Sequence, residues 1–125
     1  MKVPVIAAAG ITDGRGIAAA LALGASGAQI GTAYLLCPEA RISTYHRAAI
    51  KSARDNRSAI TNVLTGRTAR GFVNRIVAEL GPLATGVPSF PLLVAALALL
   101  RTKAESEGSA DFSALYAGQA AALCR

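Results

Sequence analysis

Two short apolar segments that each carry a glycine near their end restrict the fold of this sequence more than any other feature. The first covers residues 3–11 and contains Gly10, and the second covers residues 28–32 and contains Gly31. Each has the character of a buried parallel strand that stops where its backbone approaches a ligand. Between them, Thr12 or Asp13 can cap an amphipathic helix that Gly24 ends. We therefore predict one β-α-β unit.

In such a unit the crossover is right-handed, so the strands are parallel neighbours and their carboxyl ends share one edge. Gly10 and Gly31 should then lie close together, where unpaired backbone N–H groups gather. Barrels of eight β/α units commonly bind phosphate at this edge, after strands seven and eight. Glycine after an apolar strand is also ordinary turn chemistry, but the paired arrangement favours a phosphate site.

The length of the chain places a limit on this interpretation. With 125 residues, 53% of them hydrophobic and 16% charged, the chain is long enough and apolar enough to fold around a core. A β/α barrel needs about 250 residues, so a chain with only its last two strands would be a fragment.

Beyond the β-α-β unit the sequence predicts mainly helices. We expect a helical turn over residues 33–39, a strand over 58–64 and a proline- and glycine-rich loop over 81–91. The expected longer helices cover residues 43–56, 72–80 and 92–107, and residues 112–123 are expected to form a helix or a turn followed by a helix.

Composition argues against several other classes of protein. No stretch reaches the roughly 18 to 20 apolar residues of a membrane span, so no membrane partner is predicted. Cys37 and Cys124 stand alone, which indicates neither zinc nor disulfides and favours a reducing cytoplasm. The net charge of +6 raises the question of nucleic acid. Few aromatics and no recognition motif accompany it, so we predict solvated helix faces and no nucleic-acid partner.

With these residues placed, the chain resembles the nitronate monooxygenase family, formerly called 2-nitropropane dioxygenases, whose members are FMN-dependent β/α barrels. The similarity runs nearly from end to end. It is carried by Ala7-Ala8-Ala9-Gly10-Ile11, Asp13-Gly14-Arg15-Gly16, Gln29-Ile30-Gly31-Thr32, Pro38-Glu39, Thr65-Gly66-Arg67-Thr68-Ala69-Arg70-Gly71 with Asn74-Arg75, and Tyr116-Ala117-Gly118-Gln119.

The resemblance implies an α/β fold, the C-terminal portion of an FMN-binding TIM (β/α)8 barrel. Residues 1–125 would form a partial barrel, with the last β-α-β unit over about 3–32 and helical C-terminal segments over about 33–125. By the same resemblance the FMN phosphate would be held by Gly10, Gln29, Ile30, Gly31 and Thr32.

Family members oxidise alkyl nitronates with O₂ to a carbonyl compound and nitrite. Their catalytic histidine belongs to an earlier strand, which this sequence does not contain, so no catalytic residue is assigned here and the isolated chain is expected to be inactive. His46 is the only histidine, and we expect it to be a helix residue without a catalytic role. Tyr34 and Tyr116 could approach a flavin, but isolated tyrosines are more often packing residues, which is what we expect of both.

One residue departs from the family pattern: Ala9 stands where the family usually has the first of two glycines. If that glycine serves a positive φ, the alanine strains the turn; if φ is negative, the change costs little. Two alternatives to a nitronate monooxygenase stay open, a flavin-dependent enoyl-ACP reductase-like enzyme and a truncated, non-catalytic product. The sequence leaves the substrate and the oligomeric state undecided.

Overall fold

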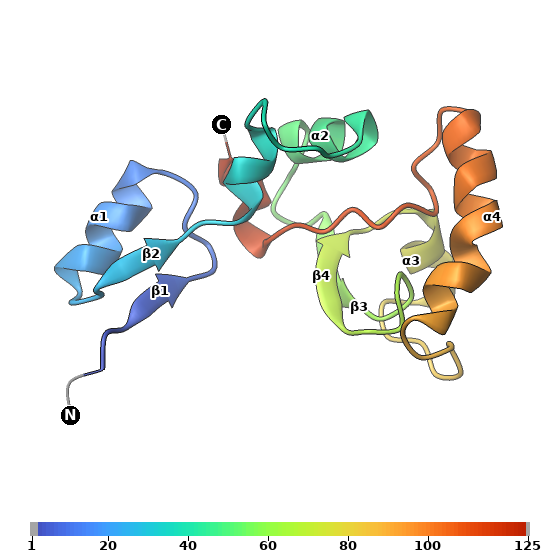
Figure 1. Cartoon of the computed structure of the whole chain (residues 1–125), viewed down its shortest axis with the longest axis horizontal. Helices are drawn as coiled ribbons and strands as arrows, with labels where there is room; N and C mark the ends of the chain where they lie inside the picture. The colour runs from blue at the N-terminus through green and yellow to red at the C-terminus, as the bar shows by residue number, and fades with distance from the viewer. Residues whose placement is uncertain (1–2, 125) are drawn as a thin grey trace. The chain divides into compact units, whose positions relative to one another are not determined.

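The computed structural model describes residues 3–124, which separate into two compact units (Figure 1). One unit contains the chain up to Asn56 together with the segment from Gly118 onward. The other unit is Arg57–Ala117. Each unit has a two-stranded sheet of its own, and within the described residues neither closes into a barrel.

The first unit begins with the β-α-β arrangement that the sequence predicts. Strand β1 (Ile6–Ala8) pairs in parallel with β2 (Gly27–Gln29), and helix α1 (Gly14–Ala22) connects them. Figure 1 shows the two arrows side by side and pointing the same way. The register pairs Ala8 with Gln29, so the two strands end together. The predicted parallel pairing is confirmed.

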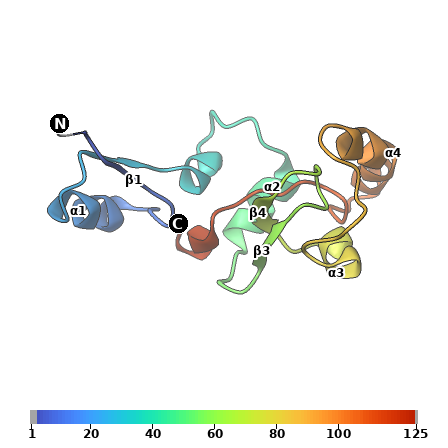
Figure 2. The same ribbon diagram turned by 90° about the horizontal axis from the view of Figure 1, so that it is seen from below.

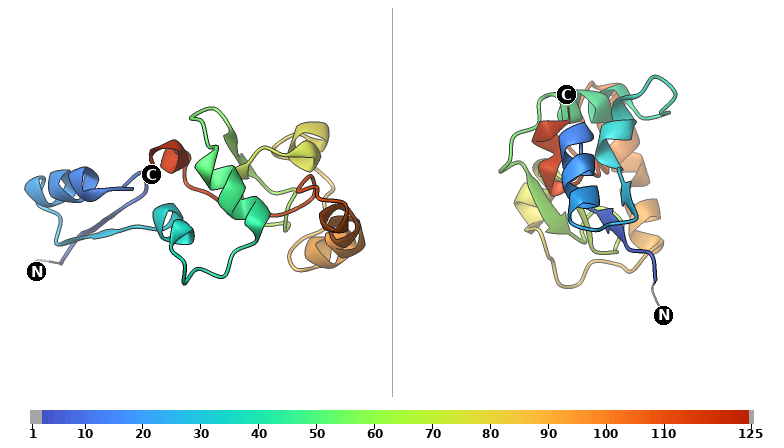
Figure 3. Two further views of the ribbon diagram at one scale, coloured as in Figure 1. Left: turned by 90° about the horizontal axis from the view of Figure 1, so that it is seen from above. Right: turned by 90° about the vertical axis from the view of Figure 1, so that its left-hand side faces the viewer.

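Helix α1 lies along one face of this small sheet in Figures 2 and 3. Large apolar side chains of the β-α-β unit nevertheless remain in solvent, among them Val5, Ile6 and Leu23. Within the described residues neither strand has a second neighbour. Exposed apolar residues and open edges are features that proteins normally cover, so this unit offers surface for further strands and helices.

The remainder of the first unit consists of short helices. The 3₁₀ helix η1 is Thr32–Leu36, helix α2 is Thr44–Lys51, and a second 3₁₀ helix, η2, is Gln119–Leu123. The Arg47 guanidinium donates to the carbonyl oxygens of Leu36, Cys37 and Ala40 at 2.6, 3.2 and 3.1 Å. These bonds satisfy carbonyl groups at the end of η1 and just after it, and they attach this segment to α2.

The second unit is built around an antiparallel hairpin of β3 (Ser58–Thr61) and β4 (Ala69–Phe72). Helices α3 (Arg75–Leu80) and α4 (Leu92–Ser106) follow. The core is a cluster of four buried side chains, against which further apolar residues pack. The four are Val63, Leu64, Ile76 and Val77.

Three predicted helices, over residues 72–80, 112–123 and 43–56, are shorter in the structure than the sequence predicts. The helix expected from residue 72 begins only at Arg75, because Phe72 is the last residue of β4 and donates its N–H to the Leu115 carbonyl at 2.9 Å. The helix or turn-helix expected over 112–123 is helical only in η2, because the chain before it runs along β4 and bonds to it. Backbone groups that find partners on a neighbouring strand do not need a helix. The helix expected over 43–56 is also shorter, ending at Lys51.

Candidate functional site

The loops that follow β1 and β2 leave the sheet at the same edge. The pairing of Ala8 with Gln29 is the last of the parallel register, so the loop at Ala9 and Gly10 and the loop at Ile30 and Gly31 both follow directly from it. This edge is the carboxyl end of a parallel sheet, where ligands of open α/β sheets bind. The structure thus brings together the two glycine-bearing loops that the sequence singles out.

The first loop has an unusual backbone. Ala9 has a φ of 70° and Gly10 a φ of 72°, so two consecutive residues occupy the left-handed region. Ala9 is the only residue other than glycine with a positive φ among residues 3–124. The conformation suits glycine, which has no Cβ to oppose it, and it costs an alanine about 1–2 kcal/mol. The departure from the family pattern therefore leaves a strained turn.

We predict that Ala9→Gly raises the stability of the first unit or leaves it unchanged, since relief of the strained φ exceeds or offsets the added freedom of the unfolded chain. The matched change one residue earlier, Ala8→Gly in strand β1, should cost about 0.5–1 kcal/mol. Urea unfolding followed by amide signals of the first unit measures both. Equal losses at the two positions would show that the φ of Ala9 carries no strain.

A hollow of about 240 Å³ lies beside these loops. It is lined by Ala8, Ala9, Ile11, Gln29, Gly31, Thr32 and Gly118. Three of the five residues predicted to hold a phosphate are in this lining, namely Gln29, Gly31 and Thr32. The lining residues carry no charged side chain, so their polar groups are the Gln29 amide, the Thr32 hydroxyl and the backbone.

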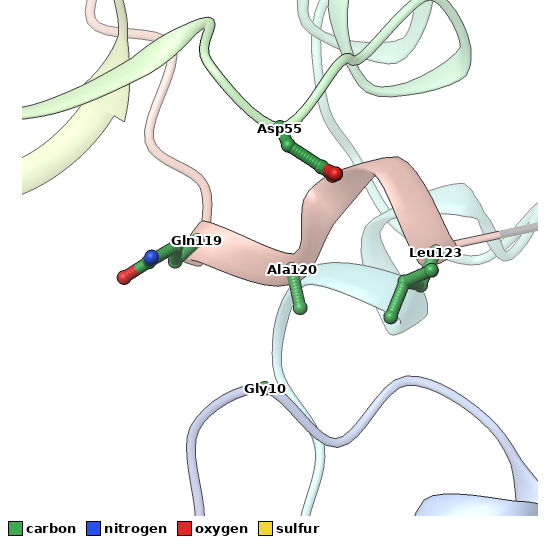
Figure 4. Close-up of a pocket in the computed structure, with 5 residues that line it drawn as sticks. All are labelled: Gly10, Asp55, Gln119, Ala120 and Leu123. Atoms are coloured by element: carbon green, nitrogen blue, oxygen red, sulfur yellow. The ribbon is translucent and has the colours of Figure 1, made fainter.

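The other two predicted residues lie elsewhere. Ile30 is half-buried, and Gly10 lines a second hollow of about 450 Å³ (Figure 4). The second hollow is formed with Asp55, Gln119, Ala120 and Leu123. In Figure 4 the Ala120 methyl points toward the Gly10 loop, whereas the Gln119 amide turns away from it.

The Thr32 hydroxyl has a partner that sequence reasoning missed. The Gly118 N–H donates to Thr32 Oγ1 at 2.8 Å, which joins residues 86 positions apart in the sequence. Gly118 belongs to the Tyr-Ala-Gly-Gln segment, and this motif was the only sequence signal for it.

The N-terminus of α1 is occupied by the chain itself. The Asp13 carboxylate caps the helix, accepting from the N–H groups of Arg15 at 3.0 Å and Gly16 at 3.1 Å. The Arg15 guanidinium also bonds to it at 2.7 Å, and this hydrogen bond, with the Gly16 N–H and the nearby charge, lowers the pKa of Asp13. These N–H groups are therefore already paired and leave the recognition of any anion to the loops.

The other residues that the sequence singles out, His46, Tyr34, Tyr116 and Cys124, line neither of these two hollows. His46 is a half-buried residue of α2. Tyr34 is 61% exposed on η1, so the expectation that it is a packing residue is wrong for this structure. In the second unit the Tyr116 hydroxyl donates to Thr65 Oγ1 at 3.1 Å and its ring packs on the core cluster. Burial raises the pKa of the Cys124 thiol.

Residues 3–124 contain no group of three or more His, Cys, Asp or Glu side chains placed to hold a metal. Among these residues, too, no helix combines the length and the apolar character that crossing a membrane requires.

Comparison with known proteins shows which family this chain belongs to. The nitronate monooxygenase from Pseudomonas aeruginosa is 47% identical over 125 residues, which cover 99% of this chain and 36% of that protein. The crystal structure of a nitroalkane oxidase from Streptomyces ansochromogenes superimposes with a TM-score of 0.84 at 40% identity, covering 100% of this chain and 35% of the other. FabK from Thermotoga maritima gives 0.70 at 29% identity, covering 98% and 39%.

The chain thus spans about a third of the length of the relatives it matches. The family model described as nitronate monooxygenase matches residues 1–125, the whole of the sequence. The chain belongs to the nitronate monooxygenase family.

Proposed function

We propose that the hollow at the carboxyl ends of β1 and β2 receives the phosphate of FMN. The observation that carries the proposal is the open space beside Gly31. A Cβ built there meets no atom within 4 Å, and its φ of −114° lies outside the left-handed region that favours glycine. Neither packing nor a positive φ requires glycine at this position. A ligand that occupies the space beside residue 31 would explain why a glycine stands there.

The surrounding groups fit an anion. The Thr32 hydroxyl and the backbone N–H groups near Gly31 are hydrogen-bond donors, and the described residues of the lining include no carboxylate that would repel a phosphate. Gly10 likewise has open space where a Cβ would stand. We assign phosphate binding to Gln29, Gly31 and Thr32, which line the hollow. For Gly10 and Ile30, which are outside that lining, phosphate binding is proposed from the family resemblance.

We further propose that the complete protein is an FMN-dependent nitronate monooxygenase, which converts alkyl nitronates and O₂ into a carbonyl compound and nitrite. When bound, FMN supplies the electron transfer of this reaction. The residues of this chain bind and orient the cofactor through its phosphate. No residue of the chain is assigned as catalytic, because by family resemblance the catalytic histidine lies on an earlier strand.

The surface of the first unit supports the proposal that this chain binds the phosphate while the rest of the protein covers the flavin ring. Among residues 3–124 the strands have open edges, and Val5, Ile6 and Leu23 are exposed. Further strands of a β/α barrel would cover such surfaces and enclose the isoalloxazine ring. The chain alone should therefore bind FMN far more weakly than a whole barrel and release no nitrite.

A chimera tests the function. We predict that this chain, substituted for the matching third of the Pseudomonas aeruginosa relative, gives a protein that retains FMN and releases nitrite from an alkyl nitronate. His46→Ala in the chimera serves as the matched control and should leave turnover nearly unchanged. A folded chimera that binds FMN without oxidising nitronate, or a loss of turnover on replacement of His46, would contradict the proposal.

A further inference from the structure

We propose that Gly118 is a positioning residue of the phosphate site: its N–H holds the Thr32 hydroxyl so that the hydroxyl proton is donated to the bound phosphate. The inference rests on the proposed FMN site. It adds Gly118 to the site, a residue of the C-terminal segment that lies outside the two strand loops.

The hydrogen-bonding capacity of a hydroxyl group is the basis of the argument. A threonine hydroxyl has one proton to donate and two lone pairs to accept with. One lone pair of Thr32 is taken by the Gly118 N–H at 2.8 Å, and this is the only hydrogen bond of the side chain within residues 3–124. The proton is therefore directed elsewhere. Both residues line the 240 Å³ hollow, where an acceptor such as a phosphate oxygen would meet it.

The Gly118 bond also makes the hydroxyl a stronger donor. Hydrogen bonds arranged in a chain polarise one another, so an oxygen that accepts a bond gives up its own proton more readily to the next acceptor. A chain from the Gly118 N–H through Thr32 to an anion has this arrangement.

A glycine stands at position 118 because the Thr32 hydroxyl leaves little room for a side chain there. Its φ of −68° and ψ of 162° are open to other residues, so backbone freedom does not require glycine. A Cβ there would stand 3.3 Å from Thr32 Oγ1, closer than ordinary van der Waals contact. A side chain at residue 118 would therefore press on the hydroxyl that the N–H holds.

Both ends of this hydrogen bond are anchored on α2. Arg47 fastens the segment that follows η1, and η2, which begins directly after Gly118, contacts α2 and buries Ala121. The donor and the acceptor are thus held by one helix. A ligand that recruits the Thr32 proton finds the hydroxyl already oriented, which lowers the entropy lost on binding.

The test compares FMN with riboflavin, which lacks the phosphate. Flavin fluorescence is followed while the chain is added in excess, for wild type, Gly118→Ala, Thr32→Val and Thr32→Ser. We expect Thr32→Val to lower the FMN-to-riboflavin affinity ratio roughly tenfold and Gly118→Ala about threefold, as loss and weakening of one charge-assisted hydrogen bond. Thr32→Ser, which keeps the hydroxyl, should retain most of the ratio.

A double variant separates positioning from general damage. Gly118→Ala should lower the ratio no further once Thr32→Val is present, because the two changes act on one bond. Gly27→Ala is the matched control: its Cβ is equally crowded, 3.3 Å from Ile6 Cδ1, but lies at the other end of the strand pair. It should leave the ratio unchanged. Additive effects of Gly118→Ala and Thr32→Val, or an unchanged ratio in folded Gly118→Ala, would overturn the inference.

Amide NMR signals of the wild-type chain provide a readout that needs no variant. FMN should shift the Gly31 and Gly118 amide protons, and riboflavin should shift them less. A shift at Gly31 without one at Gly118 would overturn this inference and leave the FMN site standing. A titration that moves neither signal would overturn both.

Discussion

Gly66→Ala should remove about 2–5 kcal/mol from the free energy of unfolding of the second unit. Gly66 has a φ of 84°, which an alanine adopts only with strain. A Cβ there would also stand 2.5 Å from the Pro88 oxygen, 2.6 Å from the Phe90 nitrogen and 2.8 Å from the Ser89 carbonyl carbon. All three are backbone atoms, so the loop over residues 81–91 must move to admit the methyl group.

The displaced loop is held by polar contacts that would be lost with it. The Asn62 side chain donates to the Ala84 oxygen and accepts from the Ala84 nitrogen, each at 3.0 Å. The Arg67 guanidinium lies 4.3 Å from the centre of the Phe90 ring. Movement of the loop weakens these contacts, which is why we expect a loss toward the upper end of the range.

Gly86→Ala is the matched control for this prediction. Its φ of 82° is almost the same, but a Cβ there meets nothing within 4 Å. It should cost about 1–2 kcal/mol, the strain of the left-handed conformation alone. The free energy of unfolding of both variants is measured by hydrogen exchange of the Val63 and Leu64 amides in the buried cluster. Similar losses of unfolding free energy for the two variants would show that the crowding around Gly66 does not contribute to the cost of the substitution.

The β-α-β unit could be predicted from sequence because its signals are local. Apolar runs, a cap at Asp13 and a closing Gly24 lie within one stretch of chain, and the right-handed crossover fixes the rest. Which of Thr12 and Asp13 caps the helix was settled only by the carboxylate contacts. The φ of Ala9 could not be predicted either, since an alanine in a turn gives no sign of its conformation.

Strand β4 and the Thr32–Gly118 contact depend on partners that are distant in sequence. The segment Ala69–Phe72 contains an arginine and a glycine and resembles a turn, yet β3 and the chain around Leu115 supply its hydrogen bonds. A Cβ at Gly71 would stand 3.0 Å from the Leu115 oxygen, so this glycine permits the close approach. Local propensity does not contain such information, because the stabilising bonds form only in the folded unit.

Gly31→Val should weaken binding of FMN by roughly tenfold or more while the chain stays folded. The structure shows open space at the Cβ position and a φ of −114°, so the fold accepts the side chain. The same space is the one that we assign to the phosphate, and two methyl groups there would exclude its oxygen atoms. Titration of FMN at micromolar concentration with excess protein measures the loss, and amide spectra verify the fold.

Riboflavin makes this prediction specific for the phosphate. Because riboflavin places no anion in the hollow, its weak binding should change much less than that of FMN, and Gly31→Val should bring the two affinities together. Ala22→Val is the matched control. It adds a similar side chain at an exposed residue at the end of α1, where the chain returns to the opposite end of the sheet. It should leave the affinities for FMN and riboflavin unchanged. If a folded Gly31→Val chain binds FMN as wild type does, the phosphate lies elsewhere and the space beside Gly31 has another purpose.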